Sequence, residues 1–369
     1  MRCKLGDISE ITKLAGYEFT KYIKYIPDGE IIAVRALNLK NGALVLDDIQ
    51  RISKEVSETL PRSQLHKNDI VLSYTGTLGE CAQIREDGKY HLAPNVCKIT
   101  PNDSVVNPNF LFQYIRCEKF KQTLINYAHG STQPTIPMST IRDIPVDIPD
   151  DLEKQGKIAA ILSILDEKIA INRAINDNLE QQAQAVFRQE LLQNGELPPN
   201  WTTGSLLDIA DYLNGLAMQK FRPVDGERGL PVLKIKELRQ GFCDYSSELC
   251  SPNIKPEFIV HDGDVIFSWS GSLLVDLWCG GTCGLNQHLF KVTSVKYPKW
   301  FYYTWTAHHL ARFVAIAADK ATTMGHIKRE DLAKAEVIIP DVASMERIGG
   351  VLQPIYNLVI NQRIENRKL

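Results

Sequence analysis

Two stretches of this chain place hydrogen-bonding side chains at the same spacing around a turn rich in hydroxyl groups. The segment 65–78 returns as 260–273, and each copy holds an aspartate, a serine four positions later and a glycine three positions after the serine. These residues are Asp69, Ser73 and Gly76 in the first copy and Asp264, Ser268 and Gly271 in the second. The two copies thus keep the same residue types in the same order.

The rest of the two halves repeats in the same order. Three further pairs of segments correspond: 34–42 with 233–241, 98–100 with 291–293, and 148–149 with 339–340. A period of this length indicates a duplicated domain and not a solenoid. Two copies of one module in one chain predict two similar sites held at a fixed separation, which suits a target made of two parts.

Each copy mixes short strand-like runs with a helix, which predicts an α+β module. The expected strands are 31–37, 70–73 and 96–99 in the first copy, and 232–235, 265–268 and 289–293 in the second. A helix follows in each copy, starting at Pro108 and at Pro298, because proline suits the first turn of a helix. A short closing strand ends at Pro149 in the first copy and at Pro340 in the second.

A long helical segment follows each module. Between residues 152 and 192 there is no proline, and apolar residues recur at spacings of three and four with one break of phase after Asn172, which predicts the seam of a coiled coil. The expected seam is Ile158, Leu162, Leu165, Ile169, Asn172, Ile175, Leu179, Ala183 and Val186. A second apolar stripe runs from Ile348 to the end of the sequence, and antiparallel pairing of the two helices is the simplest closure. Pro354 falls inside the second helix and is expected to kink it.

Composition places the chain among ordinary globular proteins. It has 369 residues, of which 44 % are apolar and 23 % charged, with a net charge of −2. The start lacks the apolar core of a signal peptide and no apolar run is long enough for a membrane span, so we expect a cytoplasmic protein that does not contact a membrane. A net charge near zero argues against a free-standing nucleic-acid binder, because such proteins attract phosphate with excess cations. If this protein binds DNA, partners are expected to supply the cations.

Catalytic and metal-binding interpretations find little support. The cluster of Cys279, Cys283 and His288 lacks the tight cysteine pairs of zinc sites. The segment 107–110, Asn-Pro-Asn-Phe, resembles an amino-methyltransferase motif but lacks its second proline, and the sequence has neither a glycine-rich cofactor loop nor a P-loop. The carboxylates of 150–154 suit a helix N-terminus better than a nuclease site. The sequence therefore predicts a binding protein that is not an enzyme and holds no metal.

Taken together, these features resemble the specificity (S) subunit of Type I restriction-modification systems. The modules open with similar segments at 5–8 and 207–209, and the motif with the aspartate, serine and glycine is similar to a strand and turn of the family's target recognition domains. The helix segment 157–169 looks like the family's central conserved region, and the last segment like its distal conserved region. The resemblance covers the whole chain.

The resemblance implies a fold class and a separate role for each domain, for the helices and for the partner subunits. It implies two pseudo-symmetric α+β target recognition domains separated by long helices that form an antiparallel coiled coil. Each recognition domain would read one half of a bipartite double-stranded DNA sequence, and the helices would fix the spacer and dock two methyltransferase (M) subunits, which nuclease/translocase (R) subunits then join. It also implies that this chain has no cofactor of its own, because S-adenosylmethionine belongs to the M partner, and ATP and Mg to the R partner. The expected domains are 1–150 (recognition domain 1), 151–194 (central helix), 195–340 (recognition domain 2) and 341–369 (distal helix).

Base recognition needs side chains with paired donors and acceptors, carried on loops. In the first module the candidates are Arg35, Asn38, Lys40, Tyr74, Thr75, Thr77, Asn95, Ser131, Thr132 and Gln133. In the second module they are Lys234, Lys236, Arg239, Trp269, Ser270, Ser272, Gln287, His288, Thr322, Thr323, His326 and Lys328. Packing or capping is the competing interpretation for any single one of them. The alternative for the whole chain is a scaffold or protein-interaction subunit that does not bind DNA.

Overall fold

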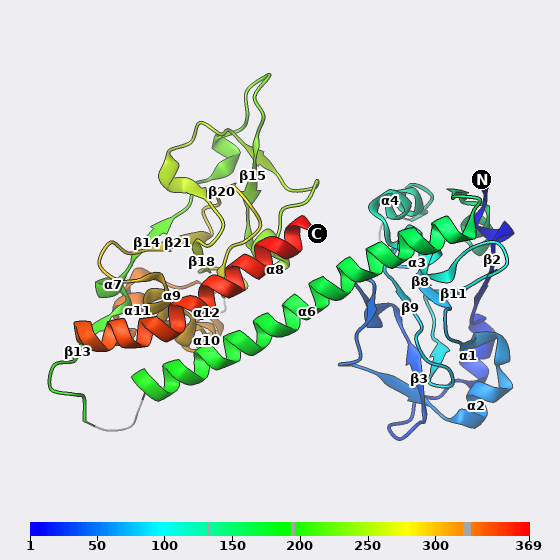
Figure 1. Ribbon diagram of the computed structural model, residues 1–369, viewed down its shortest axis with the longest axis horizontal. Helices are drawn as coiled ribbons and strands as arrows, with labels where there is room; N and C mark the ends of the chain where they lie inside the picture. The colour runs from blue at the N-terminus through cyan, green and yellow to red at the C-terminus, as the bar shows by residue number, and fades with distance from the viewer. Residues whose placement is uncertain (131–132, 193–195, 320–325) are drawn as a thin grey trace. The chain divides into compact units, whose positions relative to one another are not determined.

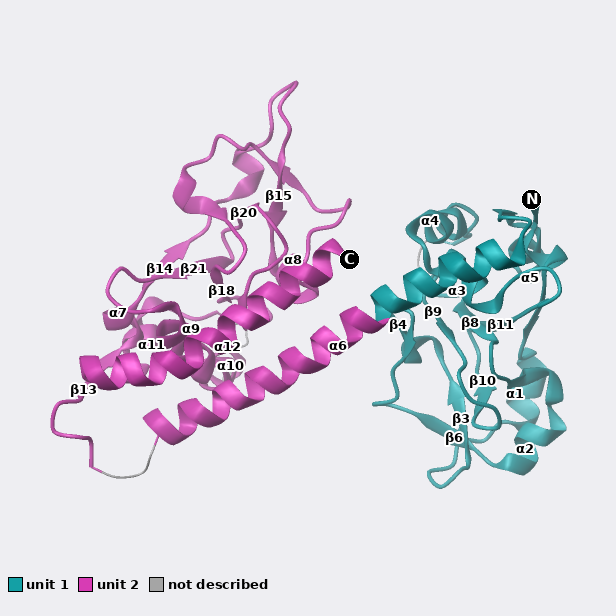
Figure 2. Ribbon diagram, viewed as in Figure 1, with its two compact units in different colours: residues 1–166 teal, residues 167–369 magenta. Residues whose placement is uncertain are grey.

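The computed structural model describes residues 1–130, 133–192, 196–319 and 326–369 (Figure 1). The chain divides into two compact units, residues 1–166 and 167–369 (Figure 2). In the described part of the chain, no helix combines the length and the apolar character needed to cross a membrane.

Unit 1 is built on two four-stranded sheets. The first has the order β2–β11–β8–β9, with all neighbours antiparallel. The second has the order β6–β3–β10–β7, in which β3 and β10 are parallel. Strands β1 and β12 pair with each other, as do β4 and β5. The strands are β1 Arg2–Lys4, β2 Ser9–Lys13, β3 Ile31–Val34, β4 Leu39–Lys40, β5 Ala43–Leu44, β6 Gln50–Ile52, β7 Gln64–Leu65, β8 Ile70–Ser73, β9 Cys81–Gln83, β10 Tyr90–Leu92, β11 Val96–Pro101 and β12 Pro145–Asp147.

Unit 2 repeats the two four-stranded sheets and the β1–β12 pairing of unit 1, whereas the β4–β5 pair has no counterpart among the described strands of unit 2. Its sheets have the orders β14–β21–β18–β19 and β16–β15–β20–β17, and β15 and β20 are again the parallel pair. Strands β13 and β22 form the third pairing. The strands are β13 Thr202–Ser205, β14 Asp211–Asn214, β15 Leu230–Leu233, β16 Leu249–Cys250, β17 Ile259–Val260, β18 Val265–Ser268, β19 Leu274–Leu277, β20 Cys283–Leu285, β21 Leu289–Thr293 and β22 Glu336–Ile339. The duplication predicted from the sequence is therefore confirmed in three dimensions.

Helices cover the sheets in both units. In unit 1 they are α1 Gly16–Tyr22, α2 Lys54–Thr59, α3 Pro108–Arg116, α4 Glu118–Asn126 and α5 Met138–Asp143, with 3-10 turns at η1 Leu5–Asp7, η2 Ala36–Asn38 and η3 Pro61–Ser63. Helix α6, Leu152–Leu191, is one unbroken element. In unit 2 they are α7 Leu206–Ile209, α8 Ile235–Gln240, α9 Lys299–His308, α10 Leu310–Asp319, α11 Arg329–Ala333 and α12 Val342–Lys368, with 3-10 turns at η4 Met218–Lys220 and η5 Pro256–Phe258. The helices expected at Pro108 and Pro298 are present as α3 and α9.

Equivalent helices fill equivalent cores. In unit 1, α3 contributes Phe110 and Leu111 to a buried cluster that also contains Ile70 and Leu72 of β8. In unit 2, α9 contributes Trp300, Phe301 and Trp305 to a cluster with Val265 and Phe267 of β18. The strand that carries the repeated motif is thus a central, fully buried strand in both units.

The expected strands 31–37 and 232–235 are too long at their C-terminal ends. Strand β3 ends at Val34 and β15 at Leu233, and a helical turn begins two residues later in each unit. The cause is a side chain that accepts a backbone hydrogen bond at the start of the turn: Asn38 Oδ1 accepts from Arg35 N at 3.1 Å, and Glu237 Oε2 accepts from Lys234 N at 3.3 Å. This contact is one half of a capping box, and it marks the start of a helix.

The two long helices of unit 2 pair in antiparallel fashion. The residue near the end of α6, Glu190, binds Arg347 near the start of α12, whereas Asn172 donates to Glu365 and Asn366 near the end of α12, both at 2.8 Å. The described helix α12 continues without a break through Pro354.

The predicted seam is partly wrong. Ile175 is exposed and Val186 half-buried, whereas Asn176 and Phe187, one position later, are buried. Because Asn172 lies in the interface and uses its amide there, the contact face after it advances by four residues to Asn176. In unit 1 the predicted seam residue Leu162 is exposed, and Ala159 is buried against the module instead.

Two arginines of α12 form ion pairs with glutamates of α6, one pair half-buried and the other more exposed. Arg363 donates to Glu180 of α6 and to Asp276 of β19, both at 2.7 Å, and its side chain is 27 % exposed. Burial raises the pKa of the Glu180 carboxyl, against the attraction of Arg363. Arg347 forms a bidentate ion pair with Glu190, but the Arg347 side chain is 59 % exposed.

We predict that Arg363→Ala lowers the free energy of unfolding of the full chain by about 2 kcal/mol, because two half-buried carboxylates lose their charged donor. Arg347→Ala is the matched control, and its cost is expected to stay below about 1 kcal/mol because the pair is exposed to solvent. Urea unfolding followed by tryptophan fluorescence measures both. Equal costs for the two variants would contradict this ranking.

Candidate nucleic-acid interface

A buried serine organises the turn that follows the motif strand in each unit. Ser73 Oγ donates to the carbonyl oxygen of Thr77 and accepts from Glu80 N at 3.1 Å. Ser268 Oγ donates to the carbonyl oxygen of Ser272 at 2.9 Å. Both serines are fully buried, so the repeated serine shapes the turn from below and does not itself face a ligand.

The repeated glycine has a conformational reason. Gly76 has φ +79° and Gly271 φ +65°, in the left-handed region that residues with a Cβ adopt only with strain. The repeated aspartate is also structural. Asp69 accepts from His66 N at 2.7 Å, and Asp264 accepts from His261 N at 2.9 Å, which fixes the bend that leads into the strand.

Four candidate residues of unit 1 line one hollow beside this turn. The hollow has a volume of about 520 Å³ and is lined by Arg35, Thr75, Thr77 and Asn95, together with neighbours from η2 and from β4. The Thr75 hydroxyl lies 2.9 Å from that of Thr135. Leu37 and Tyr25 also line the hollow, and sequence analysis did not identify them.

The other described candidates of unit 1 lie outside this lining. Asn38 is fully buried, and its amide donates to the carbonyl oxygens of Val45 and Asp48 at 3.0 and 2.8 Å, so we assign it to holding the loop. Tyr74 is half-buried with Lys13 Nζ 5.4 Å from its ring centre. Lys40 and Gln133 are exposed. Ser131 and Thr132 lie outside the described residues.

In unit 2 the corresponding turn carries an aromatic and imidazole cluster. The Trp269 ring stacks on Phe290 with centres 5.6 Å apart, and its centre lies 6.1 Å from that of His288 and 6.3 Å from that of His326. Trp269 Nε1 donates to Asn214 Oδ1 at 2.9 Å. Five candidates therefore come together here, and they are Trp269, Ser270, Gln287, His288 and His326.

Polar contacts within this cluster orient its members. Ser270 Oγ lies 3.1 Å from His288 Nδ1, and Gln287 Nε2 lies 3.3 Å from His288 Nε2. The backbone uses the same hydrogen bonds as in unit 1: Trp269 N donates to His288 O, as Tyr74 N does to Asn95 O. The two units thus have equivalent loops that carry different side chains.

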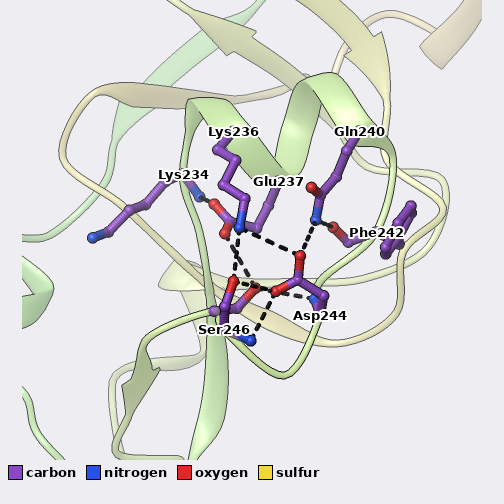
Figure 3. A network of polar contacts seen from close by, with 8 residues as sticks. Lys234, Lys236, Glu237, Gln240, Phe242, Asp244 and Ser246 are labelled. Carbon is purple, nitrogen blue, oxygen red and sulfur yellow. Dashed lines mark hydrogen bonds and ion pairs between the residues drawn. The ribbon is translucent and has the colours of Figure 1, made fainter. Parts of the chain in front are cut away.

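Lys236 of α8 belongs to a polar network (Figure 3). Lys236 Nζ contacts Asp244 Oδ2 at 3.3 Å and donates to Ser246 Oγ at 2.8 Å, and Gln240 Nε2 also donates to Asp244. The hydrogen bonds from Ser246, with Lys236 and Gln240, lower the pKa of the Asp244 carboxyl to about 2. This network holds the segment after α8, so Lys236 is already neutralised within the chain.

The same neutralisation occurs at equivalent places in both units. Lys234 forms an ion pair with Glu248, and Arg35, at the matching position of unit 1, pairs with Asp48 at 3.0 Å. The remaining candidates of unit 2, Arg239, Ser272 and Lys328, are exposed. Thr322 and Thr323 lie outside the described residues.

Cys279 and Cys283, which the metal hypothesis used, are both buried. Within the described ranges, no three His, Cys, Asp or Glu side chains are grouped so that they could hold a metal ion.

A family model described as the Type I restriction modification DNA specificity domain matches residues 1–181 and 198–367. The chain belongs to this family. Two matches for two equivalent units agree with the duplicated topology.

Curated relatives carry the same family description. The sequence is 25 % identical over 298 residues to the Type I restriction enzyme MjaIX specificity subunit of Methanocaldococcus jannaschii, covering 72 % of this chain and 66 % of that protein. It is 23 % identical over 321 residues to the Type I restriction enzyme EcoKI specificity subunit of Escherichia coli, covering 80 % and 66 %. The matched region thus spans just under two thirds of each relative's own length.

The fold is also similar to a solved structure. The crystal structure of the Type I restriction-modification system S subunit from M. genitalium matches with a TM-score of 0.57 and 12 % sequence identity, covering 100 % of this chain and 92 % of that one. The architecture of two α+β domains with a long helix between them in sequence is therefore that of the specificity family.

We predict that Ser73→Ala lowers the free energy of unfolding by about 1–2 kcal/mol, because the backbone groups of the turn lose a buried partner. Thr77→Ala, a change in the exposed hydroxyl of the same turn, is expected to alter it by less than about 0.5 kcal/mol. Chemical unfolding of the two variants checks this difference. A neutral Ser73→Ala would show that the turn does not depend on the serine.

Proposed function

We propose that this chain is the DNA-recognition subunit of a Type I restriction-modification complex, in which each unit reads one half of a bipartite sequence in double-stranded DNA. Helices α6 and α12 then fix the unspecified spacer between the halves. The proposal rests on family membership together with one structural observation: the two units present equivalent loops at the same edge of the same sheet, but with different side chains. Unit 1 offers hydroxyl, amide and apolar groups, and unit 2 an indole and two imidazoles.

The charge distribution supports a role for partner subunits in DNA binding. The chain has a net charge of −2, and cations beside both loops are paired within the chain, as at Arg35 and Lys234. Phosphate contacts supply most of the affinity of DNA-binding proteins. The chain therefore supplies base-edge recognition, and methyltransferase subunits supply the phosphate contacts.

Exposed apolar side chains on α6 support docking of those subunits. Ile161 and Ile164 are exposed in unit 1, and Ile171 and Ile175 in unit 2. Large apolar side chains that repeat along a helix surface are typical of a face that another protein covers. We propose two methyltransferase (M) subunits at this helix, followed by nuclease/translocase (R) subunits.

The proposal assigns catalysis to the partners. S-adenosylmethionine would bind the methyltransferase subunits, and ATP and Mg the nuclease subunits, so this chain would carry no cofactor and no catalytic residue of its own. Its candidate loops offer hydrogen-bonding side chains, which suit recognition.

The test is a domain exchange read out by single-molecule sequencing of methylated DNA. Replacing residues 195–340 by the corresponding domain of another family member is expected to change one half of the methylated sequence and to leave the other half and the spacer length unchanged. Replacing residues 1–150 is the matched control and is expected to change only the opposite half.

An unchanged sequence in both halves after either exchange would contradict the proposal. A salt titration of duplex binding, with and without the co-expressed methyltransferase, then distinguishes DNA recognition from the alternative of a scaffold subunit. A scaffold that does not recognise DNA would bind no duplex preferentially in either case.

A further inference from the structure

The hollow of unit 1 combines an apolar side with a polar rim. Its walls come from the η2 segment, from the motif turn at residues 75–77 and from the loop at Pro94 and Asn95. Leu37, on the η2 side, is 54 % exposed. A large apolar side chain in such a place loses its contact with water when a ligand covers it, which favours binding.

The lining is nearly neutral. Arg35 is the one cation among the described residues of the lining, and its guanidinium donates to the carboxylate and to the carbonyl oxygen of Asp48, at 3.0 and 2.8 Å. A phosphate group would have to compete with this carboxylate for the arginine. The hollow is therefore better matched to an uncharged group than to the DNA backbone.

Among the groups that base pairs present in the major groove, the C5 methyl of thymine is the apolar one. A leucine contact with that methyl group would bury apolar surface on both sides. The adenine of the same pair presents N6 as a donor and N7 as an acceptor, a pattern that the amide of an asparagine matches. Asn95, in the lining of the hollow, carries such an amide.

Asn95 has the freedom to make that contact. It is exposed, and its side-chain amide makes no hydrogen bond to another residue in the described ranges of the chain. Its backbone is fixed, with φ +72° and its carbonyl oxygen accepting from Tyr74 N at 3.1 Å. An ordered backbone that carries an unused amide is suited to hydrogen bonding with a partner.

We propose that the hollow of unit 1 reads one A·T base pair from the major groove, with Leu37 against the thymine methyl group and the Asn95 amide on adenine N6 and N7. This inference rests on the proposed function and adds the identity of one base pair in the half-site of unit 1.

The experiment uses the full chain co-purified with its methyltransferase partner, and duplexes of the methylated sequence in which each thymidine in turn is replaced by deoxyuridine. This replacement removes only the methyl group. One such replacement, in the half-site of unit 1, is expected to weaken binding roughly fourfold, the effect of one buried methyl group. In Leu37→Ala the same replacement is expected to have no effect, since the contact is already lost.

Two further variants serve as controls. Leu46→Ala changes a leucine that is 40 % exposed and does not line the hollow, so it should keep the full response to deoxyuridine. Asn95→Gly retains the left-handed backbone but removes the amide. It should no longer distinguish adenine from 7-deazaadenine at the paired position, whereas the unaltered chain should bind the deaza duplex several-fold more weakly.

The inference is overturned if no deoxyuridine in that half-site weakens binding, or if the response persists undiminished in Leu37→Ala. Equal binding of the methylated sequence and a scrambled duplex by the unaltered complex would contradict the proposed function itself. The two failures are therefore distinguishable in one set of titrations.

Discussion

The structure depends on a buried serine hydroxyl that holds the turn after the central strand of each unit. Ser73 and Ser268 satisfy backbone groups of the turn from the buried side, and a glycine with positive φ closes it. Because the buried serine fixes the turn, the side chains on its solvent-facing side can differ without changing the backbone. Thr75 and Thr77 stand in one unit where Ser270 and Ser272 stand in the other, and Tyr74 where Trp269 stands. One scaffold can thus present two chemistries within a single chain.

A second constraint concerns the helices. The antiparallel contact between α6 and α12 in unit 2 includes polar groups: Asn172 with Glu365 and Asn366, and Glu180 with Arg363, which also pairs with Asp276 of β19. Buried polar groups in a helix pair specify one register, because every other register leaves them without partners. The proposed role of α6 and α12 in fixing the spacer requires one such register.

The strands of the repeated motif, the helices after Pro108 and Pro298, and the duplication itself could be predicted because hydrophobic pattern and sequence repeat report them directly. The ends of β3 and β15 could not, since they depend on Asn38 and Glu237 accepting a backbone hydrogen bond three residues back. The seam was misassigned after Asn172 because an apolar pattern cannot show that an asparagine will be preferred in the interface to Ile175.

The structure brings some of the predicted candidate residues together. Arg35, Thr75, Thr77 and Asn95 do share one hollow, and Trp269 and His288 share one cluster. The ion pairs that neutralise Arg35 and Lys234 join residues from different loops, which periodicity does not report. Leu37 was not among the candidates because it lies at the end of the expected strand 31–37, where an apolar residue is expected to be in the core.

The claim that each unit addresses its own half of the DNA target is tested most directly by site-specific photo-crosslinking in the assembled complex. A photoreactive amino acid is placed at exposed Thr77 of unit 1 or at exposed Ser272 of unit 2, and the crosslinked nucleotides are mapped on the methylated sequence. Crosslinks are expected from position 77 in one half only and from position 272 in the other half only. Crosslinks from both positions to the same half, or to the spacer alone, would contradict that claim.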